Sequence, residues 1–315
     1  MDLVFQNLIS PVVLAFLLGI IARAVRSDLE IPSAIYQALS IYLLFAIGLK
    51  GGVSLSQTPP SELLGPIALT LALGVITPLS AFLLLNKFGR LDQVNAAACA
   101  AHYGSVSAVT FVAALEAVKI AGMPASGYLP ALVAILEIPG IIIGLLLARQ
   151  SKPGGLKTAL HEVITGKSIF LMMGGLAIGW ACGAEKIATV APFFIAPFKG
   201  VLCLFLLELG MVAASRIRDL KTAGWRLIVA GCLLPTIHGS VATIAATMVG
   251  MNAGGAAVFG AMVGSASYIA APAAVRIALP KASPGIYLTL SLGVTFPFNL
   301  AIGIPLFLKI AQHFS

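Results

Sequence analysis

Two short serine motifs are the best candidates in this sequence for binding a ligand. GSVS occupies 104–107 and GSAS occupies 264–267, each in the middle of a long apolar run. Serines two residues apart place their hydroxyls on one side of an extended chain but on different sides of a helix. Gly followed by Ser-x-Ser is also a poor helix interior. Both segments are therefore expected to be unwound, and Pro272 adds to this because it cannot donate to the carbonyl of Tyr268.

Unwound backbone at membrane depth is tolerated only where it faces protein or a water-filled cavity. Half-helices that begin there direct N–H groups and positive dipole ends at one point, which suits a small anion. Half-helices that end there offer carbonyl oxygens, which suit Na⁺. The competing interpretation is small-residue packing between helices. Two such motifs at equivalent places favour a binding site, and the absence of Lys and Arg nearby favours a small, singly charged anion.

A few other polar residues interrupt the apolar runs. Glu137 precedes Pro139, which frees the carbonyl of Ile135. The sequence therefore predicts that Glu137 is a cation ligand or a proton-sensitive gate. The alternative is a structural pair with another packed residue. Thr295 and Asn299 flank the corresponding proline of the second half. Other polar residues have structural interpretations: His102 and His238 as hydrogen-bonded structural histidines, and Glu208 as a structural or subunit contact. Glu116 and Arg276 are interpreted as solvated span ends.

Composition identifies the class of protein that holds these motifs. Of the 315 residues 59% are hydrophobic and 10% are charged, against roughly 25% charged in soluble domains. Mean hydropathy is +1.04. This excludes an ordinary soluble enzyme, a disordered protein and a nucleic-acid binder, and it predicts an all-α polytopic membrane protein. The predicted spans number ten: 8–25, 31–49, 63–86, 94–118, 127–149, 168–184, 191–214, 224–248, 254–279 and 284–309.

The positive charges predict the orientation of these spans. Connections on one side hold 14 Lys and Arg residues and those on the other side hold 5. The positive-inside rule then places both termini outside and the polar stretch 150–167 in the cytoplasm. The first residues, Met1 to Asn7, contain no Lys or Arg, so no signal peptide is expected. All four cysteines lie in apolar runs and are expected to be buried.

The two halves of the chain repeat each other. Residues 96–117 align with 256–277 with eight of 22 positions identical, including both serines of each motif. Five spans per half is an odd number, so the second half must be inserted upside down. Inverted repeats of this kind are typical of secondary transporters.

One stretch of the sequence resembles two catalytic motifs but lacks a residue that each of them requires. The stretch 161–168 ends like a P-loop but has His161 where Gly is needed, and it lacks the second His of a zinc-protease motif. No residue set suggests bond-making chemistry, so we expect neither an enzyme nor a cofactor or transition metal, with Na⁺ as the only metal.

The motifs HYGSVSAVTF, LEIPGIIIG, GSASYIAAPAAVRIALP and LGVTFPFNLAIGIPL resemble the SbtA-type sodium-dependent bicarbonate transporters over essentially the whole chain. The resemblance implies an elevator of two inverted repeats with broken crossing helices four and nine. Repeat one, 1–149, would hold gate helices 8–49 and core helices 63–149. A cytoplasmic linker, 150–167, would precede repeat two, 168–315, with gate helices 168–214 and core helices 224–309. Family members are homotrimers of the inner membrane that import bicarbonate with Na⁺ and are inhibited by a PII-like cytoplasmic regulator.

The resemblance also implies the site residues. Substrate would be bound by Gly104, Ser105, Val106, Ser107, Gly264, Ser265, Ala266, Ser267 and Tyr268. Sodium would be bound by Ser105, Ser107, Thr110, Glu137, Ser267, Ala270, Thr295 and Asn299.

Three other functions stay open on the sequence. A sodium-coupled symporter of another small monoanion would share every feature above. A cation/proton exchanger would use Glu137 as its proton carrier. A non-transporting membrane sensor would use the cytoplasmic stretch 150–167 as a docking surface.

Overall fold

The computed structural model describes residues 9–148, 158, 161 and 164–315, with backbone only at 168 and 216–223. These parts of the chain are helical and contain no strand. Most of the predicted linker 150–167, and with it the surface expected to dock a regulator, lies outside the described residues.

Every one of the ten expected segments contains helix. The elements of the first half are α2 (Pro11–Ala24), α3 (Ser33–Ser56), α4 (Pro60–Lys87), α5 (Gln93–Tyr103), α6 (Ala108–Ile120) and α7 (Leu129–Leu147). Those of the second half are α9 (Lys167–Ala188), α10 (Ala191–Phe194), α11 (Phe198–Ala223), α12 (Trp225–Met248), α13 (Ala253–Val263), α14 (Ala271–Ala278), α15 (Pro284–Leu288), η1 (Thr289–Thr295), α16 (Phe296–Phe298), η2 (Asn299–Gly303) and α17 (Ile304–Phe314).

Seven stretches of helix are long and apolar enough to cross a membrane, which supports a polytopic membrane protein. They are Ser33–Ser56, Pro60–Lys87, Gln93–Ile120, Leu129–Leu147, Ala191–Ser215, Trp225–Met248 and Pro284–Phe314. Two further apolar helices, α2 and α13, have only 14 and 11 residues. In α9 the backbone leaves helical geometry at Gly183, which has φ 69°.

Two predicted span ends lie well short of the end of the helix: the seventh span is predicted to end at 214, but α11 continues to Ala223, and the second differs as well. The second span was expected to end at residue 49, before Lys50, but α3 continues to Ser56. A lysine at the end of a span can direct its ammonium group to water while its stem stays in the helix. The helix stops only ahead of Pro59 and Pro60, since the residue before a proline disfavours helical backbone.

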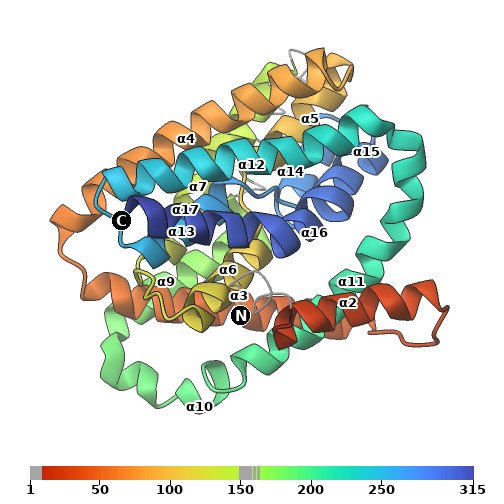
Figure 1. The fold of residues 1–315 in the computed structure, drawn as a ribbon. Coiled ribbons are helices and arrows are strands. Elements are labelled where there is room, and N and C mark those ends of the chain that lie inside the picture. Colours follow the sequence, from red (N-terminus) through yellow and green to blue (C-terminus); the bar gives the residue numbers. More distant parts are fainter. Residues whose placement is uncertain (1–8, 149–157, 159–160, 162–163) are drawn as a thin grey trace.

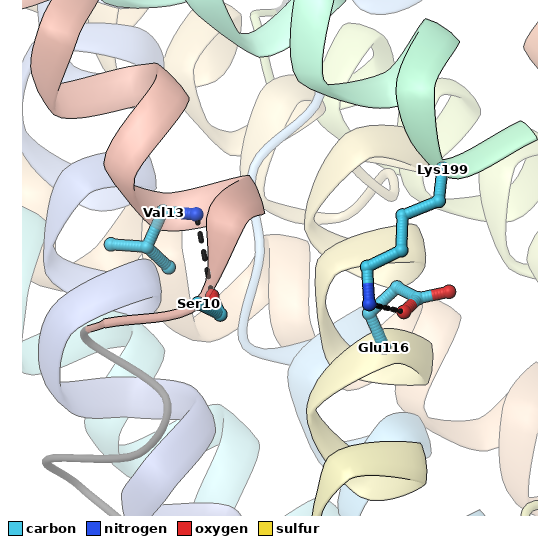
Figure 2. A network of polar contacts seen from close by, with 4 residues as sticks. All are labelled: Ser10, Val13, Glu116 and Lys199. Atoms are coloured by element: carbon cyan, nitrogen blue, oxygen red, sulfur yellow. Dashed lines mark hydrogen bonds and ion pairs between the residues drawn. The ribbon is translucent and has the colours of Figure 1, made fainter.

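Side-chain caps fix where four of the described helices begin: α2, α5, α6 and α13. The Ser10 hydroxyl accepts from the N–H of Val13 at 3.4 Å at the start of α2, as Figure 2 shows. Asp92 caps α5, and Asn252 caps α13. Burial opposes ionisation of Asp92, but the hydrogen bonds that its carboxylate accepts from Asn95 and Val94 prevail and lower its pKa.

The helices form two parts (Figure 1). We call the first the paired layer; in it α3 packs on α9 and α2 packs on α11. The second, the bundle, contains α4 to α7 and α12 to α17. Glycines allow the helices of the paired layer to approach closely: a Cβ on Gly48 would lie 2.9 Å from Cα of Gly175, and one on Gly210 would lie 3.1 Å from Cα of Gly19.

Gly179 provides a test of this packing. A Cβ at this position would lie 2.2 Å from the backbone oxygen of Leu49. We expect Gly179→Ala to lower the free energy of unfolding by about 1–3 kcal/mol, because backbone rather than a flexible side chain must move. Thermal unfolding in detergent measures this. Gly174→Ala on the same helix, where a Cβ would meet nothing within 4 Å, is the control and should not destabilise. Equal behaviour of the two variants would contradict the prediction.

In the bundle, α4, α7 and α12 continue through internal prolines, and threonines bind nearby backbone carbonyls. Thr70 donates to the oxygen of Pro66 at 2.6 Å, and Thr243 donates to that of Gly239 at 2.7 Å. Such bonds satisfy hydroxyls where water is excluded. The expectation that all four cysteines are buried is wrong: Cys99 is buried, whereas Cys182, Cys203 and Cys232 are only partly buried.

Candidate functional site

Both serine motifs interrupt helices, as the sequence predicts. The first break follows α5 at Tyr103 and ends where α6 begins at Ala108. The second break runs from the end of α13 at Val263 to the start of α14 at Ala271, so it extends three residues beyond the GSAS motif.

Hydrogen bonds join the two breaks directly. The backbone N–H of Ser107 donates to the hydroxyl of Ser265 at 2.8 Å. The backbone N–H of Ser267 donates to the carbonyl of His102 at 2.8 Å. The His102 ring also bonds the carbonyl of Ser267 through Nδ1. Two segments about 160 residues apart in the sequence therefore form a single buried structure.

His102 connects the breaks at two points, which the sequence did not reveal. A carbonyl only accepts, so Nδ1 must carry the proton and donate to Ser267. The ring stacks on Tyr287, with centroids 4.5 Å apart. This geometry agrees with the prediction that His102 is structural. The segment that His102 holds in place is the backbone of the second break.

Replacing His102 with phenylalanine should loosen this connection. The variant retains an aromatic ring against Tyr287 but leaves the Ser267 carbonyl without its side-chain donor, which costs about 1–3 kcal/mol. We expect lower thermal stability and a lower maximal uptake rate. His238→Phe is the matched control, because it also removes a buried histidine bond, to Ser80 at 2.7 Å, but not one at the breaks. Equal loss of uptake in both variants would contradict a specific role of His102.

Three of the four motif hydroxyls are already engaged. Ser107 accepts from the N–H of Thr110 at 3.1 Å and caps α6. Ser265 donates to the carbonyl of Met262 at 2.7 Å, in addition to accepting from Ser107. Ser267 accepts from the N–H of Ala271 at 3.3 Å. Among these four, only the Ser105 hydroxyl, also buried, has no hydrogen-bond partner in the described parts of the chain.

Unpartnered buried oxygens gather around the breaks. Besides Ser105, the Thr110 hydroxyl and the Asn299 side-chain oxygen are buried and form no hydrogen bond with any described residue. Asn299 donates through Nδ2 to the carbonyl of Gly264 at 2.9 Å, which leaves its oxygen free. Leaving a buried polar atom unsatisfied costs about 1–3 kcal/mol. Oxygen ligands of this kind are those that hard cations prefer.

Other predicted site residues have different surroundings. The Thr295 hydroxyl donates to the carbonyl of Gly231 at 2.8 Å, so the Tyr103 hydroxyl, 2.7 Å away, is the donor between the two. The Tyr268 ring packs edge-on against Phe296, with centroids 5.5 Å apart. Ala270 caps α14 and can offer only its backbone carbonyl. Gly104, Val106, Gly264 and Ala266 are buried within the breaks.

Glu137 lies one helical turn from the first break. On α7, a Cβ at Gly140 would be 1.7 Å from the carbonyl oxygen of Gly104, and a Cβ at Gly144 would be 2.4 Å from Ala101. α5 and α7 therefore run antiparallel in close contact, and the next position on this face of α7 is Glu137. Its side chain is 3% exposed and forms no hydrogen bond or ion pair with any residue the structure describes. Such a carboxylate is a functional candidate.

The last predicted span contains a feature that sequence reasoning missed. Two π-helical segments, η1 and η2, flank the short α16. Thr295 ends η1, and Asn299 begins η2. Pro297, which lacks an N–H, was the only signal in the sequence. Segments of π-helix often occur at functional sites, because the extra residue per turn reorients side chains.

Glu116, expected to be solvated, is instead paired. Figure 2 shows Lys199 of α11 reaching Glu116 of α6, with Nζ 3.0 Å from Oε2. The Glu116 side chain is only 14% exposed. The sequence could not reveal this pair, because its partners are far apart in the chain. It links the paired layer to the bundle.

Comparison with known protein families identifies the class to which these breaks belong. The model of the Na⁺-dependent bicarbonate transporter superfamily matches residues 11–312, nearly the whole chain. The chain belongs to this superfamily. It is accordingly a transporter and not an enzyme, and the serine breaks and Glu137 all lie within the matched region of this superfamily member. No curated protein matches the chain.

Proposed function

We propose that this protein is a sodium-coupled symporter that imports bicarbonate across the cytoplasmic membrane, with both ligands bound where the two helix breaks meet. The observation that supports this most is the hydrogen-bonded contact between the breaks, surrounded by buried oxygens without partners. Neither 93–115 nor 253–275 contains Lys or Arg. Backbone dipoles, hydroxyls and Na⁺ would then have to hold the anion.

The surroundings of each residue suggest a division of roles. Ser105, Thr110 and Asn299 have free oxygens for Na⁺, and the unpaired carboxylate of Glu137 would balance its charge. The hydroxyls of the predicted ligands Ser107 and Ser267 accept from the N–H groups of Thr110 and Ala271, so they would hold the starts of α6 and α14 in place while backbone N–H groups face bicarbonate. Thr295 would position Tyr103, and Ala270 would contribute its carbonyl.

Sodium coupling has a simple physical reason. Moving a monoanion into a cell with an inside-negative potential costs ~2.3 kcal/mol per 100 mV. One Na⁺ cancels that charge, and a second would make import electrogenic and driven by the potential.

The contacts within the paired layer support an inverted repeat. If α2 corresponds to α9 and α3 to α11, a two-fold operation converts the α3–α9 contact into the α11–α2 contact, and both occur. The glycine pairs match as well, Gly48 with Gly175 and Gly210 with Gly19. The bundle has a corresponding pair of contacts: a Cβ on Gly104 would meet Pro78 of α4, and one on the equivalent Gly264 would meet Pro235 of α12.

This symmetry supports an elevator; the charge distribution adds its orientation, and the family resemblance adds its membrane, its oligomeric state and its regulator. The ten-helix arrangement would consist of a fixed gate, the paired layer, and a moving core, the bundle. Both termini would be outside the inner membrane, three copies would associate, and a PII-like regulator would dock at the cytoplasmic linker 150–167.

Uptake into proteoliposomes tests the proposed function. Wild-type protein should take up labelled bicarbonate when an inward Na⁺ gradient is imposed and not without it. The double variant Ser105→Ala/Ser265→Ala should lose at least about 90% of this uptake, because it removes the free hydroxyl of one break and the acceptor for Ser107 in the other. If the double variant still takes up bicarbonate, the proposed function stands but the site is not at the two breaks. No uptake by folded wild type would exclude bicarbonate.

The unpartnered carboxylate of Glu137 favours one competing function, a cation/proton exchanger. That function requires Na⁺ and proton movement with no anion present. A proton flux driven by Na⁺ in bicarbonate-free vesicles would favour exchange over symport. Competition by small organic monoacids would instead indicate a broader anion specificity.

A further inference from the structure

A cavity of ≈ 290 Å³ opens between the paired layer and the bundle, on the side that the charge distribution predicts to be outside. Its lining combines α3, α6, α7, the loop before α7, and the start of α11. The charged residues among this lining are Lys50, Glu116 and Lys119. We call this cavity the lysine vestibule.

The lysine vestibule leads toward the helix breaks. Two of its lining residues, Ile47 and Val112, also line a second cavity of ≈ 20 Å³. That cavity is bounded by Ala108, the first residue of α6, and by Ile269 of the second break. A space of this size holds about one water molecule. The two cavities are therefore neighbours between the surface and the breaks, with the apolar side chains of Ile47 and Val112 lining both.

The vestibule has an excess of positive charge. Lys50 of α3 and Lys119 of α6 line the same cavity, so both ammonium groups add positive charge to it. Lys199 neutralises Glu116, so these four residues carry a net charge of +2. The Lys50 ammonium lies 5.8 Å from the centroid of the Phe198 ring, which helps to hold it at the vestibule wall. The breaks themselves have no Lys or Arg, and among the residues that line the two cavities the lysines belong to the vestibule.

We propose that the lysine vestibule is a recruiting site for small oxyanions, in which Lys50 and Lys119 concentrate the anion before it passes between Ile47 and Val112 to the breaks. A cleft with one sign of charge and low-dielectric walls raises the local concentration of the opposite ion and its rate of association. The inference rests on the proposed anion transport and adds where the anion first binds.

The first test measures the charge of the vestibule without transport. Ala125, in the vestibule lining, is replaced by cysteine and treated with two methanethiosulfonate reagents, one carrying a sulfonate and one carrying a trimethylammonium group. The ratio of anionic to cationic reaction rates should exceed that at an Ala184→Cys control, which lies outside the vestibule. It should fall about fivefold when Lys50→Gln and Lys119→Gln are added. Protein without the added cysteine supplies the background from the native thiols.

The second test measures bicarbonate uptake. The double variant Lys50→Gln/Lys119→Gln should raise the apparent KM for bicarbonate about three- to tenfold at low ionic strength, with little change in maximal rate. The difference from wild type should shrink at high salt. Lys186→Gln, an exposed lysine predicted on the same side but outside the vestibule, should leave the KM unchanged.

The two tests separate the vestibule from the proposed function. An unchanged reagent ratio, or a changed ratio with an unchanged KM, overturns the recruiting role while sodium-dependent uptake by wild type keeps the function. A wild type that fails to transport bicarbonate but shows the expected reagent ratio overturns the function and leaves an anion-attracting vestibule. A lower reagent ratio in the double lysine variant, together with a salt-sensitive rise in its KM for bicarbonate, supports both the recruiting role and the proposed function.

Discussion

Replacing Gly140 with alanine is expected to abolish sodium-dependent uptake. A Cβ at this position would lie 1.7 Å from the carbonyl oxygen of Gly104, a contact that no rotamer change can relieve because both groups belong to the backbone. Either α7 or the first break must move. Overpacking of this kind costs about 3 kcal/mol, and the displacement falls on the segment that holds Ser105.

Two variants separate this effect from general destabilisation. Gly144→Ala, one turn further along α7, meets Ala101 in α5 and not a break, so it should lower the unfolding temperature but retain the apparent affinity for Na⁺. Gly200→Ala, where a Cβ would meet nothing within 4 Å, should behave as wild type. Thermal unfolding and uptake are measured on the same preparations. Full uptake by Gly140→Ala would show that the close approach of α7 is not needed at the site.

The second large effect is expected at Asn299. Asn299→Ala removes both the donor to the Gly264 carbonyl and the free oxygen that we assign to Na⁺. The apparent Na⁺ affinity, measured from the Na⁺ dependence of uptake, should fall at least about tenfold, equivalent to 1.4 kcal/mol. Gly303→Ala offers an independent variant, because its Cβ would lie 2.3 Å from that oxygen and displace it while the amide remains.

Asn86→Ala is the matched control for Asn299. It also removes a side-chain bond to a backbone carbonyl, from Nδ2 to Leu91 at 2.9 Å, but far along the chain from either break. Its Na⁺ dependence should match that of wild type. If Asn299→Ala and Asn86→Ala shift the Na⁺ dependence equally, Asn299 acts on stability alone and is not a ligand.

The sequence by itself determined the class of protein and the position of both breaks. Hydropathy and the Gly-Ser-x-Ser motifs are local properties, and local backbone preferences decide where a helix ends. The interruptions at 104–107 and from 264 onward follow from them. The unpaired carboxylate of Glu137 could also be singled out, because an ionisable residue in an apolar run needs no structure to be noticed.

Only the tertiary structure decided which of these atoms remain available for a ligand. Ser107, Ser265 and Ser267 look equivalent to Ser105 in the sequence, yet their hydroxyls are engaged within the breaks. His102 as the connector between the breaks, and Lys199 as the partner of Glu116, depend on contacts between distant segments. Hydrogen-bond partners are set by how helices pack in three dimensions, and no pattern along the chain encodes that packing directly.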